Sequence, residues 1–365
     1  MIPAHFVELT ELPRTGRGKV DRAALPVPSR VIEPPRGETE AAIAAVWAEV
    51  LQLDEVGRDE NIYALGADSL TVQDILVAMT RRLGITLTQA QAAACPTVAL
   101  MAEIADGPTG SGPFGTVSGR LAGLAPTTVP LHSGAGRPVF CFTGAGASAL
   151  AFVPFAEKLA RRDGVGSVYA FAPNGLENRG LPDWTVAAAA RRHLRDLRRI
   201  QPTGPYVLVG HSLGGFIALE VARRLRAAGE RVDQVVVLDT FLPQRFARSA
   251  TTVDPDLSVT APEAPLPRAE LWRRRARIPL AGLVPMSPVD SARAMEEVGR
   301  RVGIFHRPKV YDGDVLLVLG TENHDDPRIW RDRIVTGELT VLHLDCDHMS
   351  IIRDPHIGAV VDAME

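Results

Sequence analysis

The stretch 206-YVLVGHSLGGFIALEV-221 decides the fold of the larger part of the chain. An apolar run of strand length leads into GHSLG (210–214), and a helical pattern follows. This is a G-x-S-x-G sequence in the strand–turn–helix context that gives the motif its meaning. Such a turn is tight, so its neighbours must be small, and it lifts the Ser212 hydroxyl above the sheet. The alternative is a glycine-rich turn with an incidental serine, and the flanking strand and helix patterns disfavour it.

Five further apolar runs have the length of buried strands. They span 139–142, 168–171, 235–238, 315–319 and 341–344. Helical patterns such as 186–200 lie between most of them, and this alternation predicts a mostly parallel sheet with helices on both faces. The alternation of strand and helix patterns is interrupted at 241–310, a long insertion rich in Pro and Arg. A connection of this length is usually a lid or a binding element.

A serine nucleophile needs a base. His348 in 344-LDCDHMSII-352 follows the last predicted strand, at the carboxyl edge of the sheet, and is our candidate. His211 is adjacent to Ser212, but we expect its ring to point elsewhere. His193 falls within a predicted helix and His343 within a predicted strand.

The base in turn needs an orienting acid, and two positions are open. Asp239 ends the strand that follows the Ser212 helix, whereas Glu322, Asp325 and Asp326 follow the next strand. Either position could reach the base. Asp239 is favoured because it ends its strand directly, while the others lie in a polar turn.

Residues 343–348, HLDCDH, resemble a cluster of metal ligands. We expect His343, Asp345 and Asp347 to alternate on one face of an extended segment, and no second ligand group is apparent elsewhere. The sequence therefore predicts no metal site. Three scattered cysteines indicate no disulfide framework, and we expect Cys141 and Cys346 to be small buried residues.

The second motif is 63-YALGADSLTVQDILV-77, where Ser69 stands at a loop-to-helix junction. Capping of the helix is the simplest role for this serine. Apolar stripes in the Ser69 helix, in 43–51 and after Thr97 predict a bundle of three or four short helices over 38–106. These residues hold eleven Asp and Glu against three Arg, a charge of −8.

The remaining segments connect these units. Residues 26–38 are rich in proline, and residues 107–130 are a tether rich in Gly, Pro, Ser and Thr. A net charge of −3 lacks the basic character of a nucleic-acid-binding protein. No membrane span or signal peptide is apparent, and we expect a cytoplasmic protein.

Residues 131–365 resemble a type I thioesterase domain of the α/β-hydrolase superfamily, as found at the C-terminal end of nonribosomal peptide synthetases. GHSLGG, Asp239 at a strand end, His348 in DHM and the insertion at about 241–310 carry this resemblance. It implies a triad of Ser212, Asp239 and His348. It also implies oxyanion donors from the Leu213 and Ala145 N–H groups, the latter in 141-CFTGAGAS-148, where Thr and Gly replace the usual Pro or His.

Residues 31–106 resemble a peptidyl carrier domain, because LGADSL (65–70) matches its attachment motif with Ala67 in place of a second Gly. The resemblance implies a covalent 4′-phosphopantetheine on Ser69 and a phosphopantetheinyl transferase as partner. Residues 1–30 resemble the end of an adenylation domain, with Lys19 as a relic of its acyl-adenylate contact. We therefore expect a fragment of a larger synthetase with upstream adenylation and condensation domains.

The expected function is terminal chain release: an acyl or peptidyl thioester on the Ser69 arm is transferred to Ser212 and leaves by hydrolysis or intramolecular cyclisation. One alternative is a carrier scaffold with a catalytically silent hydrolase-like domain. Another is an esterase acting on diffusible esters. The arginines in 272–277 are either a solvated helix face or a docking patch for the acidic carrier.

Overall fold

The computed structural model describes residues 13, 20, 32–67, 69–85, 87, 92, 95–106, 125, 127–162, 164–176, 180–260, 282–283 and 288–364. Lys19, the arginines of 272–277 and nearly all of 107–126 lie outside these residues. The chain divides into two compact units, a smaller one built mainly from the first hundred residues and a larger one built from the rest.

The smaller unit contains three helices among the described residues: α1 (Gly37–Leu51), α2 (Ser69–Leu83) and α4 (Val98–Asp106). The predicted stripe of α2 is buried, and so is most of that of α1, where Trp47 has no exposed surface. In α4 the expected Leu100 and Ile104 are only half-buried, and Val98 and Met101 are buried instead. An ion pair between Arg58 and Glu40 (2.9 Å) fastens the loop after α1 to that helix. A fourth helix of the predicted bundle is not among those described, and most of residues 86–94 lies outside the described residues.

The larger unit is built on a six-stranded sheet in the order β2-β1-β3-β4-β5-β6, and every neighbouring pair is parallel. Its strands are β1 (Thr128–Phe142), β2 (Gly166–Phe171), β3 (Tyr206–His211), β4 (Val232–Leu238), β5 (Val315–Leu319) and β6 (Leu339–His343). Each contains all or most of a predicted apolar run, but β1 begins at Thr128, inside the predicted tether 107–130 and well before the predicted run 139–142. From β1 the chain adds β2 on one side and then returns to add β3 on the other side. Such a switch point opens a crevice at the carboxyl ends of the strands.

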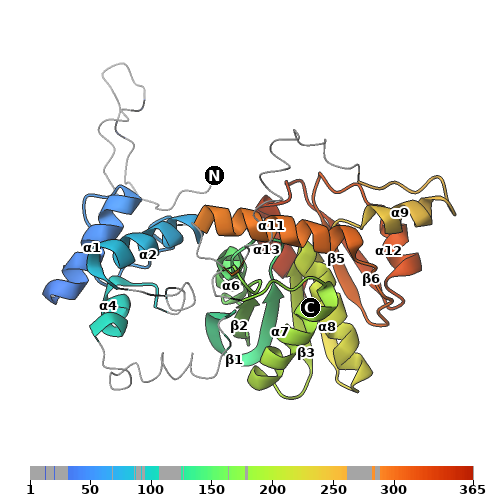
Figure 1. The fold of residues 1–365 in the computed structure, drawn as a ribbon, viewed down its shortest axis with the longest axis horizontal. Coiled ribbons are helices and arrows are strands. Elements are labelled where there is room, and N and C mark those ends of the chain that lie inside the picture. Colours follow the sequence, from blue (N-terminus) through green and yellow to red (C-terminus); the bar gives the residue numbers. More distant parts are fainter. Residues whose placement is uncertain are drawn as a thin grey trace. The chain divides into compact units, whose positions relative to one another are not determined.

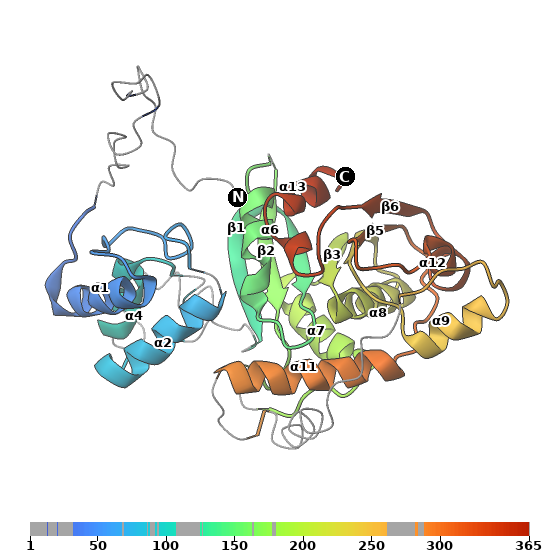
Figure 2. The same cartoon turned by 90° about the horizontal axis from the view of Figure 1, so that it is seen from above.

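Helices cover both faces of this sheet (Figures 1 and 2). One face carries α7 (Val186–Ile200) and α8 (Leu213–Ala227), with α12 (Pro327–Arg333) beside them. The other carries α6 (Val153–Leu159) and α13 (His356–Asp362), which contact each other, with the short 3₁₀ helices η2 (Ala149–Phe152) and η4 (Ser350–Ile352) nearby. Stacking of Phe216 on Trp330, with ring centroids 6.0 Å apart, joins α8 to α12.

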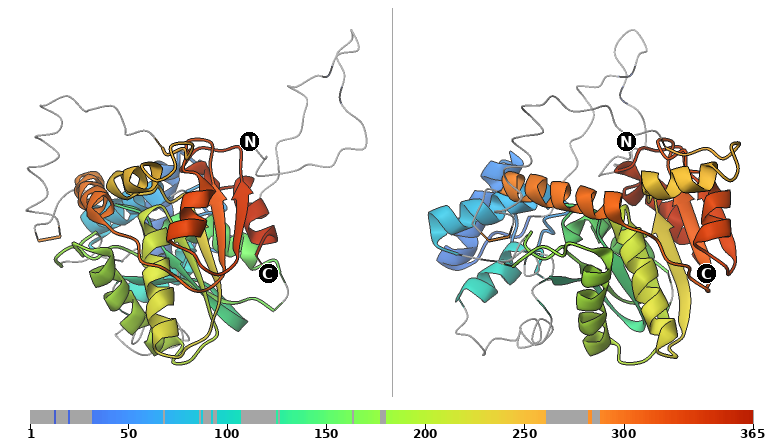
Figure 3. Two further views of the ribbon diagram at one scale, coloured as in Figure 1. Left: turned by 90° about the vertical axis from the view of Figure 1, so that its right-hand side faces the viewer. Right: turned by 45° about the vertical axis from the view of Figure 1, so that its right-hand side comes forward.

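The insertion after β4 contributes α9 (Gln244–Thr251) and α11 (Pro288–Phe305). The long helix α11 crosses the carboxyl ends of the strands rather than covering a face of the sheet (Figure 3, orange). Buried Asp325 ties down the first half of the insertion, because its carboxylate accepts hydrogen bonds from the backbone N–H groups of Leu242 (2.6 Å) and Thr260 (2.8 Å). Asp325 therefore has a structural role, because it holds the backbone of the insertion.

Candidate active site

Ser212 lies on a sharp turn between β3 and α8 and has φ 55° and ψ −127°, a backbone conformation that is strained for a residue with a side chain. Three glycines make this turn possible. An added Cβ would lie 2.2 Å from the Gly214 oxygen at Gly210, 2.0 Å from the Phe142 oxygen at Gly214, and 2.1 Å from Thr240 Oγ1 at Gly215. The motif glycines are therefore required by backbone packing, as the sequence predicted.

The turn is fastened to the end of β4. The Ser212 N–H donates to the Leu238 oxygen (2.9 Å), and Thr240 Oγ1 donates to the Ser212 oxygen (2.7 Å). Asp239 stands between these two partners in the sequence. The same strand end thus supports both the serine turn and the carboxylate.

Asp239 and His348 form the acid–base pair of the candidate site. His348 Nδ1 lies 2.7 Å from Asp239 Oδ2, and the Gly320 N–H donates to Asp239 Oδ1 (2.9 Å). Burial raises the pKa of the Asp239 carboxyl, but the hydrogen bonds from His348 and Gly320 outweigh it, so the pKa lies below its usual value. An ionised carboxylate only accepts, so Nδ1 carries the proton and Nε2 is left as the base.

The other acids discussed above have different partners. Asp325 binds the insertion backbone, and Glu322 is exposed. Asp326 caps α12 and pairs with Arg328 at 2.8 Å. The structure therefore places Asp239 alone of these four carboxylates on His348.

His211, immediately before Ser212, lies in the site, although the sequence led us to expect its ring to point elsewhere. Its ring stacks on that of His348, with centroids 4.7 Å apart, and its Nε2 lies 2.9 Å from the His348 carbonyl oxygen. Because a carbonyl only accepts, Nε2–H is the donor. Burial, and then the neighbouring His348, lower the pKa of His211 to about 4, so the ring is neutral near pH 7. No sequence pattern signalled this contact, because it depends on the path of a distant loop.

The loop that presents His348 also differs from expectation. The chain leaves strand conformation after His343, so the expected alternation of residues 343, 345 and 347 on one extended face does not form. Asp347 instead closes a turn by accepting from the N–H groups of Met349 and Ser350, both at 2.9 Å. Within the described residues, no group of three His, Cys, Asp or Glu could hold a metal ion.

Ser212 Oγ forms no hydrogen bond with His348 in the described part of the chain. The contact between His211 and His348 nevertheless brings the base against the residue that precedes the serine. Catalytic hydrogen bonds of unliganded enzymes are commonly long and tighten only when substrate is present. The geometry therefore joins the candidate acid and base directly and brings the candidate base against His211, the neighbour of the candidate nucleophile.

The loop after β1 borders the serine. A Cβ added to Gly144 would lie 2.9 Å from Ser212 Cβ, so glycine alone permits this approach. Thr143 fixes the start of the loop, since its Oγ1 donates to the Phe171 oxygen at 3.1 Å. No hydrogen bond among the described residues uses the N–H of Ala145 or of Leu213. Both predicted oxyanion donors are therefore free to donate.

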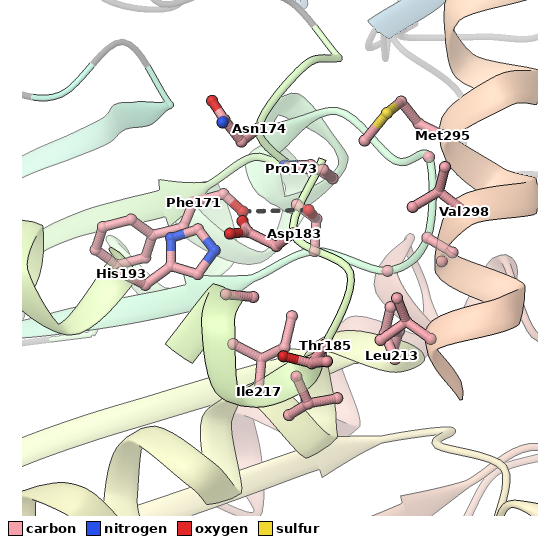
Figure 4. Close-up of a pocket in the computed structure, with 18 of the residues that line it drawn as sticks. Phe171, Pro173, Asn174, Asp183, Thr185, His193, Leu213, Ile217, Met295 and Val298 are labelled. Atoms are coloured by element: carbon pink, nitrogen blue, oxygen red, sulfur yellow. Dashed lines mark hydrogen bonds between the residues drawn. The ribbon is translucent and has the colours of Figure 1, made fainter. Parts of the chain in front are cut away.

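A pocket opens beside this loop and runs between β2, α7, α8 and α11 (Figure 4). The space between these walls, counted together with its open mouth, is about 480 Å³. Its lining is mostly apolar, and it includes the Phe171, Ile217, Met295 and Val298 side chains. One polar feature is the ion pair of Arg192 and Asp183 at 2.7 Å.

Three further groups of the larger unit, His193, Cys141 and Cys346, are kept neutral by burial. His193 lines the pocket but is buried between aromatic rings, and burial, followed by the charge of Arg192, lowers its pKa well below its usual value. Burial raises the pKa of Cys141 well above its usual value and that of Cys346 to about 11. All three cysteines are free and buried, as predicted for two of them.

Ser69 is the first residue of α2, a helix of 15 residues. A helix start favours a negatively charged phosphodiester, and a serine hydroxyl can form one, so the position fits a phosphopantetheine arm. Gly66, three residues earlier, has φ +94° and open space around its α-carbon.

Comparison with known protein families identifies one domain in each part of the chain. Residues 137–272 match the model of the thioesterase domain, and residues 41–104 match that of the phosphopantetheine attachment site. The chain joins a phosphopantetheine carrier domain to a thioesterase domain. The predicted covalent 4′-phosphopantetheine cofactor is confirmed at the level of the domain.

Relatives with the same arrangement are nonribosomal peptide synthetases. The chain is 32% identical over 370 residues to Enterobactin synthase component F of Escherichia coli (strain K12), covering 96% of this chain and 26% of that protein. It is 29% identical to Malpibaldin synthetase of Mortierella alpina, covering 96% of this chain but 6% of that protein. The chain therefore spans about a quarter or less of these relatives' own length.

Among solved structures, a four-domain nonribosomal peptide synthetase in its holo form, bound to AMP and glycine, matches with a TM-score of 0.50 and 24% identity. The match covers 99% of this chain and 29% of that one. Together with the family models, this similarity confirms the predicted helical carrier and α/β-hydrolase fold. In the described ranges, no helix is long and apolar enough to cross a bilayer.

Proposed function

We propose that this chain performs terminal chain release in nonribosomal peptide biosynthesis. The observation that carries the proposal is the 2.7 Å contact of His348 Nδ1 with Asp239 beside a strained serine turn, in one chain with a carrier domain. A phosphopantetheine on Ser69 would supply the acyl or peptidyl chain as a thioester. The partners are then a phosphopantetheinyl transferase and upstream adenylation and condensation domains.

In the first half-reaction, Ser212 Oγ attacks the thioester carbonyl carbon while His348 Nε2 takes the serine proton. Asp239 holds Nδ1–H in place and stabilises the imidazolium cation. The N–H groups of Leu213 and Ala145 donate to the oxyanion. His348 then gives the proton to the sulfur as the C–S bond breaks, and an ester on Ser212 remains.

In the second half-reaction, His348 takes a proton from water or from a nucleophile of the bound chain itself. The new bond forms at the ester carbonyl, the C–O bond to Ser212 breaks, and the proton returns to Ser212 Oγ. The apolar pocket under α11 lies beside the oxyanion loop, where an acyl chain would extend from the serine.

Two rival functions make different predictions. A carrier scaffold with a silent hydrolase-like domain would accept phosphopantetheine on the carrier and retain a loaded acyl group indefinitely. A free esterase would cleave a small soluble thioester as readily as one on its own carrier.

The experiment is intact mass spectrometry of the protein incubated with an acyl-coenzyme A and a phosphopantetheinyl transferase. We expect one acyl-phosphopantetheine to be added to the wild type and then to lose its acyl group, with no addition to Ser69→Ala. The acyl group should persist in Ser212→Ala. Modification of Ser69→Ala, or release by Ser212→Ala at the wild-type rate, would contradict the proposal.

A further inference from the structure

The oxyanion loop and helix α11 meet at two places where only glycine fits. From the helix side, a Cβ added to Gly299 would lie 2.3 Å from Ala145 Cβ and 2.9 Å from Ala145 Cα. From the loop side, Gly146 has φ +68°, and an added Cβ would lie 2.6 Å from the Ala292 oxygen and 2.8 Å from the Glu296 nitrogen. Backbone therefore packs directly against backbone over two turns of α11.

The loop is confined on its other side as well. Gly144 lies against the Ser212 side chain, and Thr143 is fixed to the end of β2 by its hydrogen bond to the Phe171 oxygen. Ala145 is thus held between the serine turn and α11. A displacement of either wall changes the distance between the Ala145 N–H and the carbonyl bound at Ser212.

Helix α11 is firmly seated at this contact. Ser291 Oγ donates to the Leu176 oxygen (2.9 Å) at one end of the helix. Along the middle, Met295 and Val298 are almost fully buried and face the pocket (Figure 4). Close-packed interiors transmit displacement rather than absorb it, so α11 forms a stiff wall behind the loop.

We propose that Gly299 is a positioning residue for the oxyanion hole: by allowing α11 to touch Ala145, it sets the place of the Ala145 N–H. The insertion then does more than cover the site, because its last helix completes the geometry that stabilises the transition state. This inference rests on the proposed function, in which Ala145 is an oxyanion donor.

Gly303 provides a matched control on the same helix. It lies four residues after Gly299, and its added Cβ would meet only Leu213 Cδ1, at an ordinary contact distance of 3.9 Å. Replacement by alanine should raise helix propensity equally at both positions. Only Gly299→Ala pushes on the oxyanion loop.

The test measures steady-state hydrolysis of a small soluble acyl thioester and inhibition by an alkylboronic acid, whose tetrahedral adduct with serine places an oxygen in the oxyanion hole. Gly299→Ala should lower kcat by about tenfold or more, toward the effect of losing one oxyanion donor, with KM unchanged. Boronate affinity should fall in parallel, and Gly303→Ala should match wild type. The double variant Ala145→Gly/Gly299→Ala should recover part of the loss, because the closest clash is removed.

Equal behaviour of Gly299→Ala and Gly303→Ala, a loss confined to KM, or full retention of boronate affinity would overturn the inference. If Gly299→Ala does not fold, Ala145→Gly tests the contact from the other side: it loosens the loop and should lower kcat and boronate affinity together, and wild-type values would overturn the inference. The proposed function fails separately, if wild type does not turn over the thioester or Ser212→Ala does.

Discussion

Ser69 and Ser212 stand at equivalent places, each at the start of a helix of 15 residues, but their surroundings differ. Gly66 before Ser69 has open space around it, whereas Gly210 and Gly214 around Ser212 would bring an added Cβ within 2.2 Å of backbone oxygen. The difference follows from the two chemistries. An attachment serine needs access for another enzyme, while a nucleophile needs a fixed direction of attack.

The departure of Ala67 from the glycine of the carrier motif fits the same contrast. Ala67 is buried without a positive φ, so its Cβ is accommodated where the thioesterase turn would not accept one. Position 67 accepts alanine because its backbone has no positive φ. The serine turn tolerates none at its glycines because backbone atoms occupy the space.

Replacing each serine by alanine breaks this comparison most sharply. Ser212→Ala should lower release from the loaded carrier by on the order of 10⁶, the scale of losing a triad nucleophile, and leave loading intact. Ser69→Ala should abolish loading but leave hydrolysis of a small soluble thioester at the wild-type rate. Mass spectrometry measures loading, and a thiol assay measures hydrolysis. If either variant lost both activities, the two serines would not be separable as proposed.

Replacing the carboxylates sharpens the assignment of the acid. Asp239→Asn should lower kcat by roughly 10³–10⁴, because His348 would lose the partner that fixes its tautomer. Asp325→Asn is the control. It weakens the hydrogen bonds that hold the insertion backbone at Leu242 and Thr260, so it should act mainly on thermal stability and KM. Stopped-flow measurement of acylation with a chromogenic thioester distinguishes them. If Asp325→Asn lost nearly all activity and Asp239→Asn kept most of it, the acid would be Asp325 after β5 and not Asp239 after β4.

The sequence predicted the features that depend on local pattern. All six strands, α7 and the Ser212 turn follow from apolar runs and the G-x-S-x-G spacing, and Asp239 follows from its place at a strand end. The segment 343–347 is not extended as expected, because Asp347 closes a turn that alternation of residue types does not reveal.

What the sequence could not supply are contacts between distant segments. The ring of His211 against His348 and the meeting of Gly299 with Ala145 join positions more than a hundred residues apart. Neither pair leaves a periodic signal, because each depends on how a loop or an insertion returns to the sheet. Glycine in the interior of α11 was a hint, since it weakens a helix and implies a close approach.

Replacing one glycine near each serine by alanine tests, through protein stability, how tightly the two serine loops are packed. Gly214→Ala should lower the free energy of unfolding of the thioesterase domain by at least about 3 kcal/mol, because the new Cβ would overlap the Phe142 oxygen. Gly66→Ala places a side chain at φ +94° in open space and should cost the carrier about 1–2 kcal/mol. Calorimetry that resolves the two domain transitions measures both. Equal costs would mean that the two serine loops are equally constrained.

The last comparison concerns the pH dependence of stability that His211 contributes next to Ser212. Its pKa is lowered from 6.5 to about 4 by burial and by His348. The unfolded chain therefore takes up a proton near pH 6.5, but the folded chain only near pH 4. Stability is lost as pH falls through this window, by up to about 3 kcal/mol, and is independent of His211 above and below it.

His211→Gln keeps an N–H donor for the His348 oxygen but cannot titrate, so its unfolding free energy should fall less between pH 6.5 and 4 than that of wild type. His306, whose pKa burial also lowers to about 4, leaves a residual slope in both proteins. His211→Phe fills the space without a donor and should show the same flattened slope, with kcat at pH 7 lower by about fivefold because the His348 loop is held less firmly. Chemical denaturation at half-unit pH steps measures the slopes. If the pH dependence of the unfolding free energy is the same in His211→Gln as in wild type, His211 has the same pKa in the folded and unfolded chain. His211 would then not hold the His348 loop as a buried neutral donor.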